Sequence, residues 1–427
     1  MQLALLVWVL LAVGGAAEAQ PTYTREIARI FRAKCEQCHR AGDIAPFALG
    51  SYEEAVQNAR AIRRAVEAGK MPPWKPVAGH GEFRDNFSLT EQERETILAW
   101  VDGGTPEGEQ SELPEALPER GEWSLGLPDL SLEMPEEYAP PKGRDMYRCF
   151  VLPTSFDETR YVSAADILPG DRRTVHHVIL YLDTSGKAEE LDAKEEGPGY
   201  TCFGGPGTPI TAAAFLSGGV ALGGWAPGTR PRHLPEDTGM TLPARARIVM
   251  QVHYHVHGEE PSADRTRVGL YFNKAKPQKR LFYVPVLPLN GRGEPEMEIP
   301  ANAERHEVKA AFPVPPFFDA RLVQVFPHMH LLGREIRADL DLPLEQGTRP
   351  LIYINDWDFH WQGAYTYVEA VAAPAFSTIR LSCVYDNSTK NPNNPHTPPK
   401  TLRWGEGTED EMCLVFLGLT FDRDRVP

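Results

Sequence analysis

The spacing of apolar residues changes character about a quarter of the way along the chain. Within residues 20–110, apolar positions recur every three or four residues, which places them on one face of a helix. Ser51 with Glu54, and Thr90 with Glu93, form capping boxes in front of two of these runs. The pattern predicts a small all-α segment of three amphipathic helices.

From Met146 onwards, short runs rich in Val, Ile, Tyr and Phe alternate with Gly and Pro turns. No long 3.6-residue pattern recurs, and this combination is typical of antiparallel β-sandwiches. The stretch is long enough for two domains, and we place their boundary near 274–280, after an expected strand over 268–272. We therefore expect a first β-domain over 145–275 and a second over 276–427.

An acidic, proline-rich stretch connects the two kinds of pattern. Seven prolines lie within residues 105–145, among many glutamates. Proline fixes φ and removes a backbone donor, so neither helix nor sheet is expected to persist. We predict that residues 111–144 are a linker that packs partway along the next domain and limits how far the helical part can move away.

The N-terminus and the net charge constrain the compartment and the partners. Residues 1–19 contain an apolar run followed by Ala17-X-Ala19, the pattern of a secretory signal peptide. They lack an early Lys or Arg, so an uncleaved anchor is the alternative. No later segment has 18 consecutive apolar residues, so no other membrane span is expected. A net charge of −15 disfavours nucleic acid and anionic membranes as partners. We expect a periplasmic or secreted protein, in which disulfides are possible.

A haem-attachment motif follows the first predicted helix. Cys35-Glu36-Gln37-Cys38-His39 matches Cys-X-X-Cys-His, in which both thiols bind c-type haem covalently and His39 ligates the iron. A thioredoxin-like dithiol would require a βαβ context, and a zinc site would require two more ligands. The motif therefore favours haem c.

Met71 is the candidate for the second iron ligand. It lies in Lys70-Met71-Pro72-Pro73-Trp74, after the second predicted helix, where a small cytochrome c places its distal methionine. A packing methionine is the alternative. Three helices around Cys-X-X-Cys-His and a later Met resemble a class I cytochrome c domain, which we expect over residues 20–110.

Many of the 13 histidines gather in three strand-like segments. His328 and His330 alternate along Val325–Gly333, so they share one strand face about 6–7 Å apart at Cα, a separation that suits two imidazoles on one metal. Surface histidines are the alternative for any isolated pair. The other two segments contain His176 and His177, and His253, His255 and His257. Together with Glu411-Met412-Cys413, they indicate a dispersed metal constellation.

Four of these motifs occur in the order found in one enzyme family. The His-His pair, Gln-Val-His-Tyr, His-X-His followed by Gly, and Glu-Met-Cys resemble the copper type II, ascorbate-dependent monooxygenases, the family of dopamine β-monooxygenase and peptidylglycine α-hydroxylating monooxygenase. The resemblance covers roughly residues 123–427. It implies two jelly-roll β-domains side by side, each with one copper ion.

The resemblance also implies the ligand sets and one disulfide. One copper would bind His176, His177 and His253, and the other would bind His328, His330 and Met412. Two imidazoles and a thioether suit Cu(I) and leave a position open. Cys383 and Cys413 match a family disulfide beside the methionine. Cys149 and Cys202 then pair by elimination only.

The first ligand set contains a geometric tension. Neighbouring residues of a strand face opposite ways, so His176 and His177 can share a metal only if the strand kinks or bulges. His255 and His257 share a strand face with His253 and could replace or supplement it. The family pattern has one His after Gln-Val, which favours His253.

Three functions are compatible with these features. The first is a copper-dependent monooxygenase that hydroxylates a C–H bond with O2, with electrons supplied through the tethered haem. The second is a non-catalytic periplasmic haem and copper protein for electron transfer or copper binding. The third is a cytochrome attached to a β-sandwich module whose histidines are structural or hold zinc. We favour the monooxygenase, with ascorbate or a quinol-linked donor as the external reductant.

The substrate expected from the resemblance is small and apolar. The peptide-hydroxylating branch holds its substrate's carboxylate with an Arg two positions before His-X-His, and with Asn and Tyr two and four positions after the methionine. Here those positions are Phe326, Leu414 and Phe416. A carboxylate would lose its hydration there without gaining a partner.

Overall fold

The computed structural model describes residues 20–41, 45–117, 121–143, 145–203, 205–209, 220–226, 229–255, 262–316 and 319–421. The expected signal peptide and His257 lie outside these ranges. The chain divides into two compact units. The helical unit ends at Pro73 and resumes over 87–117, while the β unit comprises residues 74–86 and the chain from Pro118 onwards.

In its described part, the helical unit contains three α-helices, a one-turn π-helix and a short 3₁₀ turn: η1 (Tyr23–Ile27), α1 (Ala28–Lys34), α2 (Tyr52–Glu67), α3 (Glu91–Asp102) and η2 (Gln110–Glu112). Both predicted capping boxes are confirmed, because Ser51 and Thr90 each accept from the backbone of the glutamate three residues on. The core of this unit includes Ile27, Phe31 and Trp100.

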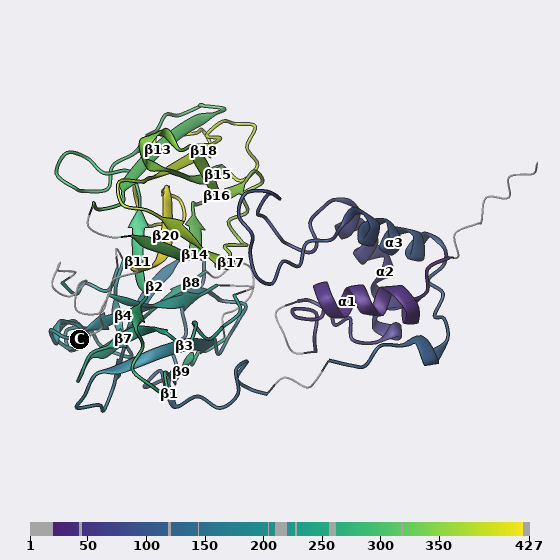
Figure 1. Cartoon of the computed structure of the whole chain (residues 1–427), viewed down its shortest axis with the longest axis horizontal. Helices are drawn as coiled ribbons and strands as arrows, with labels where there is room; N and C mark the ends of the chain where they lie inside the picture. The colour runs from purple at the N-terminus through teal and green to yellow at the C-terminus, as the bar shows by residue number, and fades with distance from the viewer. Residues whose placement is uncertain are drawn as a thin grey trace, which may run out of the picture. The chain divides into compact units, whose positions relative to one another are not determined.

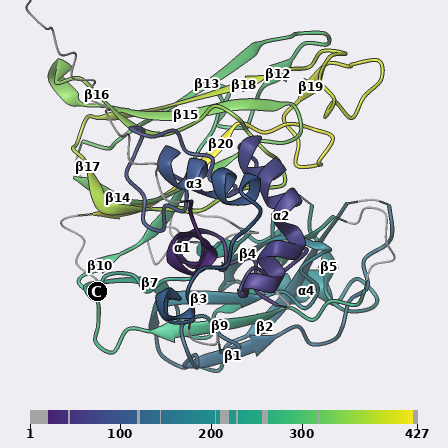
Figure 2. The same ribbon diagram turned by 90° about the vertical axis from the view of Figure 1, so that its right-hand side faces the viewer.

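The first β-half packs two five-stranded sheets around one core (Figures 1 and 2). The first sheet has the order β1 (Leu130–Glu133), β9 (Arg267–Phe272), β3 (Arg160–Leu168), β7 (Thr238–Leu242) and β10 (Lys279–Arg280). The second has the order β5 (Tyr200–Thr201), β2 (Met146–Pro153), β8 (Arg247–Tyr254), β4 (Val175–Asp183) and β6 (Ala221–Trp225). A short helix, α4 (Lys187–Asp192), lies between β4 and β5 in the chain.

The second β-half repeats this plan with two four-stranded sheets around its own core. One sheet has the order β11 (Phe282–Val286), β20 (Leu414–Phe421), β14 (Ala320–His328) and β17 (Tyr365–Ala373). The other has the order β13 (His306–Pro313), β18 (Thr378–Tyr385), β15 (Gly333–Asp341) and β16 (Thr348–Ile354). The remaining elements are β12 (Glu298–Ile299), paired with β19 (Leu402–Arg403), and η3 (Pro343–Glu345).

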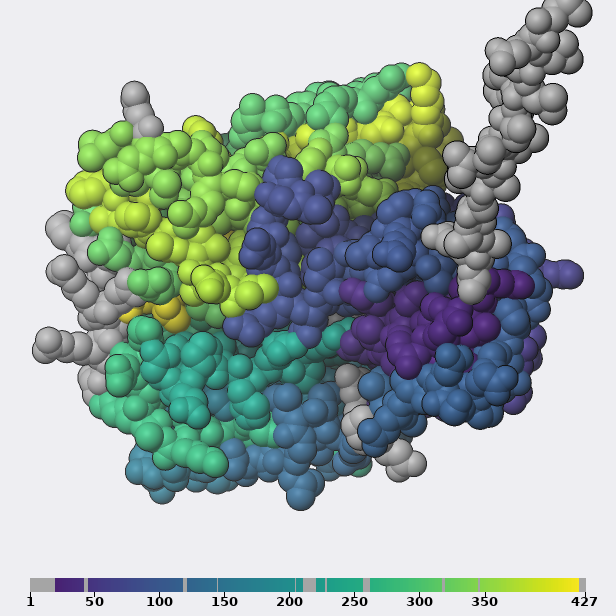
Figure 3. All heavy atoms as spheres, turned by 45° about the vertical axis from the view of Figure 1, so that its right-hand side comes forward, coloured from purple at the N-terminus to yellow at the C-terminus, as the bar shows by residue number. Residues whose placement is uncertain are grey.

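The predicted fold class is wrong. The sequence had indicated an all-α cytochrome c domain followed by two jelly-roll or sandwich domains. Over the described residues the protein is mostly β, with two five-stranded sheets, two four-stranded sheets and one two-stranded pair, and the helical unit is only a small N-terminal part. The physical reason lies partly in residues 74–86, which we had assigned to the helical domain. They contain no helix, and Trp74 and Phe83 pack against Tyr365 of the β unit. In Figure 3 the violet-blue atoms of this segment lie on the yellow-green surface of the second β-half.

The prediction that the proline-rich stretch forms neither helix nor sheet is also wrong. It contains η2 and strand β1, whose residues Leu130–Glu133 pair antiparallel with β9. The stretch was also predicted to pack along the following domain, and this is confirmed. Trp123 is buried and lies against Gly269 of β9. The apolar alternation of Leu130 and Leu132 outweighs the local proline content here.

Two disulfides are present, as expected of an exported protein: Cys149–Cys202 and Cys383–Cys413. Both pairings agree with those anticipated from the sequence. Among the described residues, none of the helices has the length and apolarity needed to cross a membrane.

Candidate metal centre

A β-bulge brings His176 and His177 to the same site. The pairing of β4 with β8 shifts register between Val175 and His177, so His176 is an extra residue on its strand. Val175 and Val178 are both buried although they are three residues apart, which a regular strand does not allow. The bulge therefore supplies the irregularity that a shared metal site requires.

His253 completes this first cluster from the neighbouring strand. It lies directly opposite His177 in the β4–β8 ladder, and its Nδ1 is 3.2 Å from Nδ1 of His176. Nitrogen atoms of all three imidazoles lie within 4.8 Å of one another. Burial lowers the pKa of each imidazole, so all three are neutral ligands at neutral pH.

Asp145 lies beside His253 and forms a hydrogen bond with His255. Its Oδ2 is 3.6 Å from Nε2 of His253, and its Oδ1 accepts from Nδ1 of His255 at 2.5 Å. Burial would raise the pKa of Asp145, but the nearby His253 and the hydrogen bond with His255 hold it below its ordinary value. The carboxylate thus favours a proton on Nε2 of His253 and leaves Nδ1 as the metal-binding nitrogen. His255 lies with Asp145 rather than in the three-histidine cluster.

The second β-half covers the first cluster with aromatic and backbone groups. Phe359 stacks on His176 with ring centroids 4.7 Å apart. Tyr147 stacks on His253 at 4.1 Å, and its hydroxyl donates to the carbonyl of Glu406 at 3.0 Å. The surroundings of the first cluster therefore depend on both halves.

His328 and His330 form the second cluster, with their Nε2 atoms 3.2 Å apart. Nδ1 of His330 donates to the carbonyl oxygen of Asp410 at 3.1 Å, and Nδ1 of His328 donates to Oε1 of Gln362 at 2.5 Å. The orientation of Gln362 is set by its amide nitrogen, which donates to the carbonyl of Phe359. Because both partners can only accept, both protons are on Nδ1.

Both Nε2 atoms consequently present lone pairs to each other. Burial lowers the pKa of His328 to about 4, and burial with the neighbouring His328 lowers that of His330 to about 3, so neither ring carries a second proton at neutral pH. Two lone pairs at this distance repel unless a cation lies between them. Nitrogens bound to one tetrahedral metal at about 2.0–2.1 Å are ~3.3 Å apart, which matches the observed separation.

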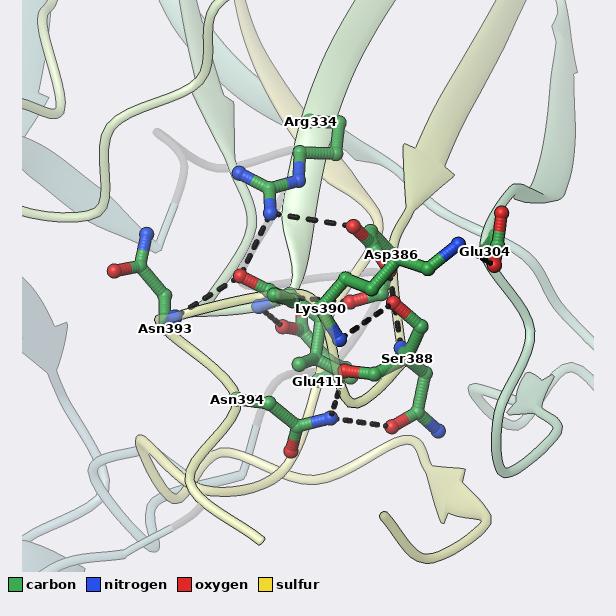
Figure 4. Close-up of polar contacts among 11 residues, drawn as sticks. Glu304, Arg334, Asp386, Ser388, Lys390, Asn393, Asn394 and Glu411 are labelled. Atoms are coloured by element: carbon green, nitrogen blue, oxygen red, sulfur yellow. Dashed lines mark hydrogen bonds and ion pairs between the residues drawn. The ribbon is translucent and has the colours of Figure 1, made fainter. Parts of the chain in front are cut away.

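The loop that carries His330 is held by Glu411 and by Arg334. Glu411 is buried and accepts from the backbone amides of His330 at 2.9 Å and Leu332 at 2.6 Å. Burial raises the pKa of Glu411 to about 8, and these amides act in the opposite direction. Arg334, the second residue of β15, donates to Asn391 at 2.7 Å and to Asp386; Figure 4 shows Arg334 with Asp386 and Glu411.

Two hydrogen bonds and the neighbouring disulfide fix the backbone of Met412. Its amide donates to Glu411 at 3.3 Å, and its carbonyl accepts from the buried Tyr385 hydroxyl at 2.7 Å. The next residue, Cys413, is tied to β18 through Cys383. Met412 itself is buried.

The two clusters are neighbours. The ring centroids of His177 and His328 are 6.5 Å apart, and Phe359 contacts both His176 and His330. All five histidines come from the β unit, so its two halves meet at their imidazoles.

An apolar wall adjoins His328. In the ladder between β14 and β20, Phe326 lies opposite Phe416, and His328 lies opposite Leu414. Directly opposed residues share a sheet face, as do residues two apart, so these three apolar side chains lie on the face of His328. Phe326 and Phe416 are only partly buried.

The haem-attachment motif occupies the turn that follows α1. Cys35 and Cys38 are thiols, and burial raises the pKa of Cys35 to about 12, which disfavours a redox-active dithiol. Nδ1 of His39 donates to the carbonyl of Phe47 at 2.9 Å, which leaves Nε2 as the iron-binding nitrogen. These residues fit a covalent haem c. Met71 is 41% exposed, so the alternative of a core-packing methionine is wrong.

Asp145, Tyr147, Phe359 and Gln362 are functional candidates that the sequence did not reveal. Asp145 and Tyr147 acquire their roles from the pairing of β2 with β8, two segments about a hundred residues apart in the chain. Phe359 and Gln362 lie in the loop 355–364, where the run Trp357 to Trp361 is unusually aromatic. That aromatic run was the available signal.

Comparisons with known proteins leave the function open. No protein-family model and no curated protein matches the chain. Among solved structures, similarity was found to the major capsid protein P2 of bacteriophage PM2 (10% identity, 68% of this chain and 97% of that chain, TM-score 0.28). It was also found to the infectious bursal disease virus VP2 subviral particle (8%, 68% and 78%, 0.19) and the PBSX exported protein XepA (8%, 60% and 86%, 0.18). TM-scores this low do not indicate a shared fold.

Proposed function

We propose that the protein is an exported, copper-dependent monooxygenase that hydroxylates a C–H bond of a small apolar substrate with O2. The observation that carries this proposal is the pair of facing Nε2 lone pairs on His328 and His330, 3.2 Å apart. Their tautomers are set by carbonyl acceptors, and a bound cation resolves their repulsion.

The donor set favours copper over zinc. Imidazole ligands suit several divalent metals, but a thioether from Met412 would select the soft Cu(I) ion. The haem motif in the same chain supplies a source of single electrons, which zinc could not use. His176, His177 and His253 would hold a second copper, in line with the sequence resemblance.

Copper, when bound, supplies the one-electron chemistry that activates O2. The residues of this chain prepare the site for it. Asp145, Gln362 and the Asp410 carbonyl select which nitrogen of each ring is available for the metal. Glu411 holds the backbone of His330, and the Phe359 ring lies against one histidine of each cluster. Phe326, Leu414 and Phe416 would bind the apolar substrate.

Haem c, attached through Cys35 and Cys38 and ligated by His39 and Met71, would deliver the electrons. Each hydroxylation needs two electrons from a donor, in addition to the two that the C–H bond of the substrate provides. An external donor, ascorbate or a quinol-linked protein of the periplasm, would re-reduce the haem.

The test combines cofactor quantitation with oxygen consumption. Protein from an export-competent host should contain two coppers and one haem that resists acid–acetone extraction. His328→Ala should remove one copper and abolish substrate-dependent O2 uptake, and His176→Ala should remove the other. His306→Ala, a change outside both clusters, should retain both coppers.

Other outcomes would contradict the proposal in different ways. Two coppers and haem without substrate-dependent O2 uptake for any apolar candidate would indicate an electron-transfer protein. Zinc in place of copper would indicate a structural module. If both His328→Ala and His176→Ala retain two coppers, the ligand sets are wrong.

A further inference from the structure

Residues 74–86 belong to the β unit although the chain on both sides of them belongs to the helical unit. The chain leaves the helical unit after Pro73 and returns to it at Phe87. Between these points the segment bonds to the edges of two strands of the second β-half. Val77 donates to the carbonyl of Tyr353 in β16, and Arg84 donates to that of Thr366 in β17, both at 2.8 Å.

The segment is also held by charge and by aromatic packing. Lys75 pairs with Asp356 at 2.8 Å, and Asp85 pairs with Arg232 of the first β-half. Phe83 lies between Tyr365 and Tyr367, with ring centroids 5.3 and 5.1 Å away. Its anchoring to the β unit is therefore extensive, and its two ends remain covalently continuous with the helical unit.

Trp74 is the first residue of this segment and lies three residues after Met71. Its indole meets the ring of Tyr365 edge to face, with centroids 5.4 Å apart. Tyr365 begins β17 and lies opposite Val325 of β14, the strand that ends at His328. Trp74 is therefore close in the chain to Met71, the proposed iron ligand. Its ring contacts Tyr365, which pairs with the strand that ends at His328, a proposed copper ligand.

The connection continues from Tyr365 to His328 without a gap. A Cβ placed on Gly363 would lie 2.6 Å from the Tyr365 hydroxyl, so the backbone of Gly363 is in contact with that end of the ring. Gly363 is bonded to Gln362, whose Oε1 accepts from Nδ1 of His328 at 2.5 Å. Only glycine allows this approach.

We propose that Trp74 and Tyr365 form the electron-transfer route from the haem to the copper at His328. This inference rests on the proposed function and adds the path to it. One electron leaves ferrous iron and reduces Cu(II) to Cu(I). No bond breaks and no proton moves, since no described residue accepts a hydrogen bond from the buried Tyr365 hydroxyl. The ring, rather than the hydroxyl, is therefore the functional part of Tyr365.

The experiment follows haem oxidation directly. In full-length protein loaded with haem and Cu(II), a flash-generated flavin semiquinone reduces the haem without oxygen, and the decay of ferrous absorbance reports transfer to copper. Loss of the Cu(II) electron paramagnetic resonance signal identifies the acceptor. Protein without copper gives the baseline.

Trp74→Leu and Tyr365→Leu should each slow the decay by at least about tenfold, equivalent to ~1.4 kcal/mol of activation free energy. Tyr365→Phe should restore the rate lost in Tyr365→Leu. Phe83→Leu is the matched control, because Phe83 packs in the same aromatic cluster but is not on the route, and its decay should stay near the wild-type rate. Haem and copper contents are measured for every variant.

Three results would overturn the inference. In the first, Trp74→Leu and Tyr365→Leu decay no more slowly than Phe83→Leu. In the second, the wild-type haem stays reduced although both cofactors are bound. The route would then be refuted, and the proposed monooxygenase would have to receive its electrons from another donor. In the third, neither cofactor binds, which would refute the proposed function itself.

Discussion

The carboxylate of Glu411 accepts a hydrogen bond from the backbone amide of His330 across 81 residues of sequence. The same carboxylate binds the amides of Leu332 and Met412, so one buried side chain sets the positions of two proposed ligands of one metal. Its removal should therefore affect both folding stability and metal binding.

We predict that Glu411→Leu lowers the free energy of unfolding by about 1–3 kcal/mol for each of the three amides left without this acceptor, at His330, Leu332 and Met412. Copper bound at His328 and His330 should be lost with it. Denaturant titration and copper stoichiometry measure the two effects. Glu409→Leu, at an exposed neighbouring position, is the control and should change neither quantity. Unchanged stability in Glu411→Leu would show that these hydrogen bonds are replaced by others.

Asp145→Asn should weaken the first copper site selectively. The amide would no longer favour a proton on Nε2 of His253, and loss of such a partner typically costs ~10–100-fold in metal affinity. Competition with a copper chelator measures the affinity of each site. Asp157→Asn changes a highly exposed aspartate in the same half and should leave both affinities unchanged. An equal loss at both sites would mean that Asp145 acts through the contact between the halves rather than through His253.

The two disulfides should contribute similarly to stability but differently to copper binding. Loops of 30 and 53 residues predict about 3–4 kcal/mol each from chain entropy. Replacing Cys383 and Cys413 with Ser should also lower copper affinity at the second cluster, because Met412 is adjacent to Cys413. Replacing Cys149 and Cys202 with Ser provides the comparison. Equal copper affinity in both double variants would argue against a role for Met412.

A peptide ending in glycine should be a poor substrate. Phe326, Leu414 and Phe416 would desolvate its carboxylate without a partner, at a cost of several kcal/mol. An uncharged apolar compound should instead gain about 25 cal/mol for each Å² of apolar surface buried. Turnover of matched charged and uncharged substrates by reduced, copper-loaded protein tests this difference. Efficient hydroxylation of the glycine-extended peptide would refute the assigned role of the wall.

Features set by neighbours in the chain could be predicted from the sequence. The capping boxes at Ser51 and Thr90 depend on residues three apart. Strand alternation predicts that His328 and His330 approach each other, and they do, although β14 ends at His328 and His330 lies in the loop that follows. Features that depend on the pairing register of distant strands could not be predicted from the sequence. The contact of Asp145 with His253 depends on how β2 aligns with β8, and no local pattern encodes that alignment.

The fold class failed for a related reason. Residues 74–86 contain turn-forming Pro and Gly, which locally indicate a loop of the helical part. Their apolar residues Trp74 and Phe83 pack against aromatic rings of β17, nearly three hundred residues later. The spacing of Val175 and Val178 did contain usable information, since two core residues three apart are compatible with a bulge between them.

That bulge means that β4 contains one residue more than its pairing with β8 uses. Deleting His176 would remove one imidazole and return β4 to strict alternation. Val175 and Val178 would then be two residues apart, still opposite Tyr254 and Val252, and both would still face the core. The strand could therefore pack without His176. The additional residue serves the histidine cluster and not the core.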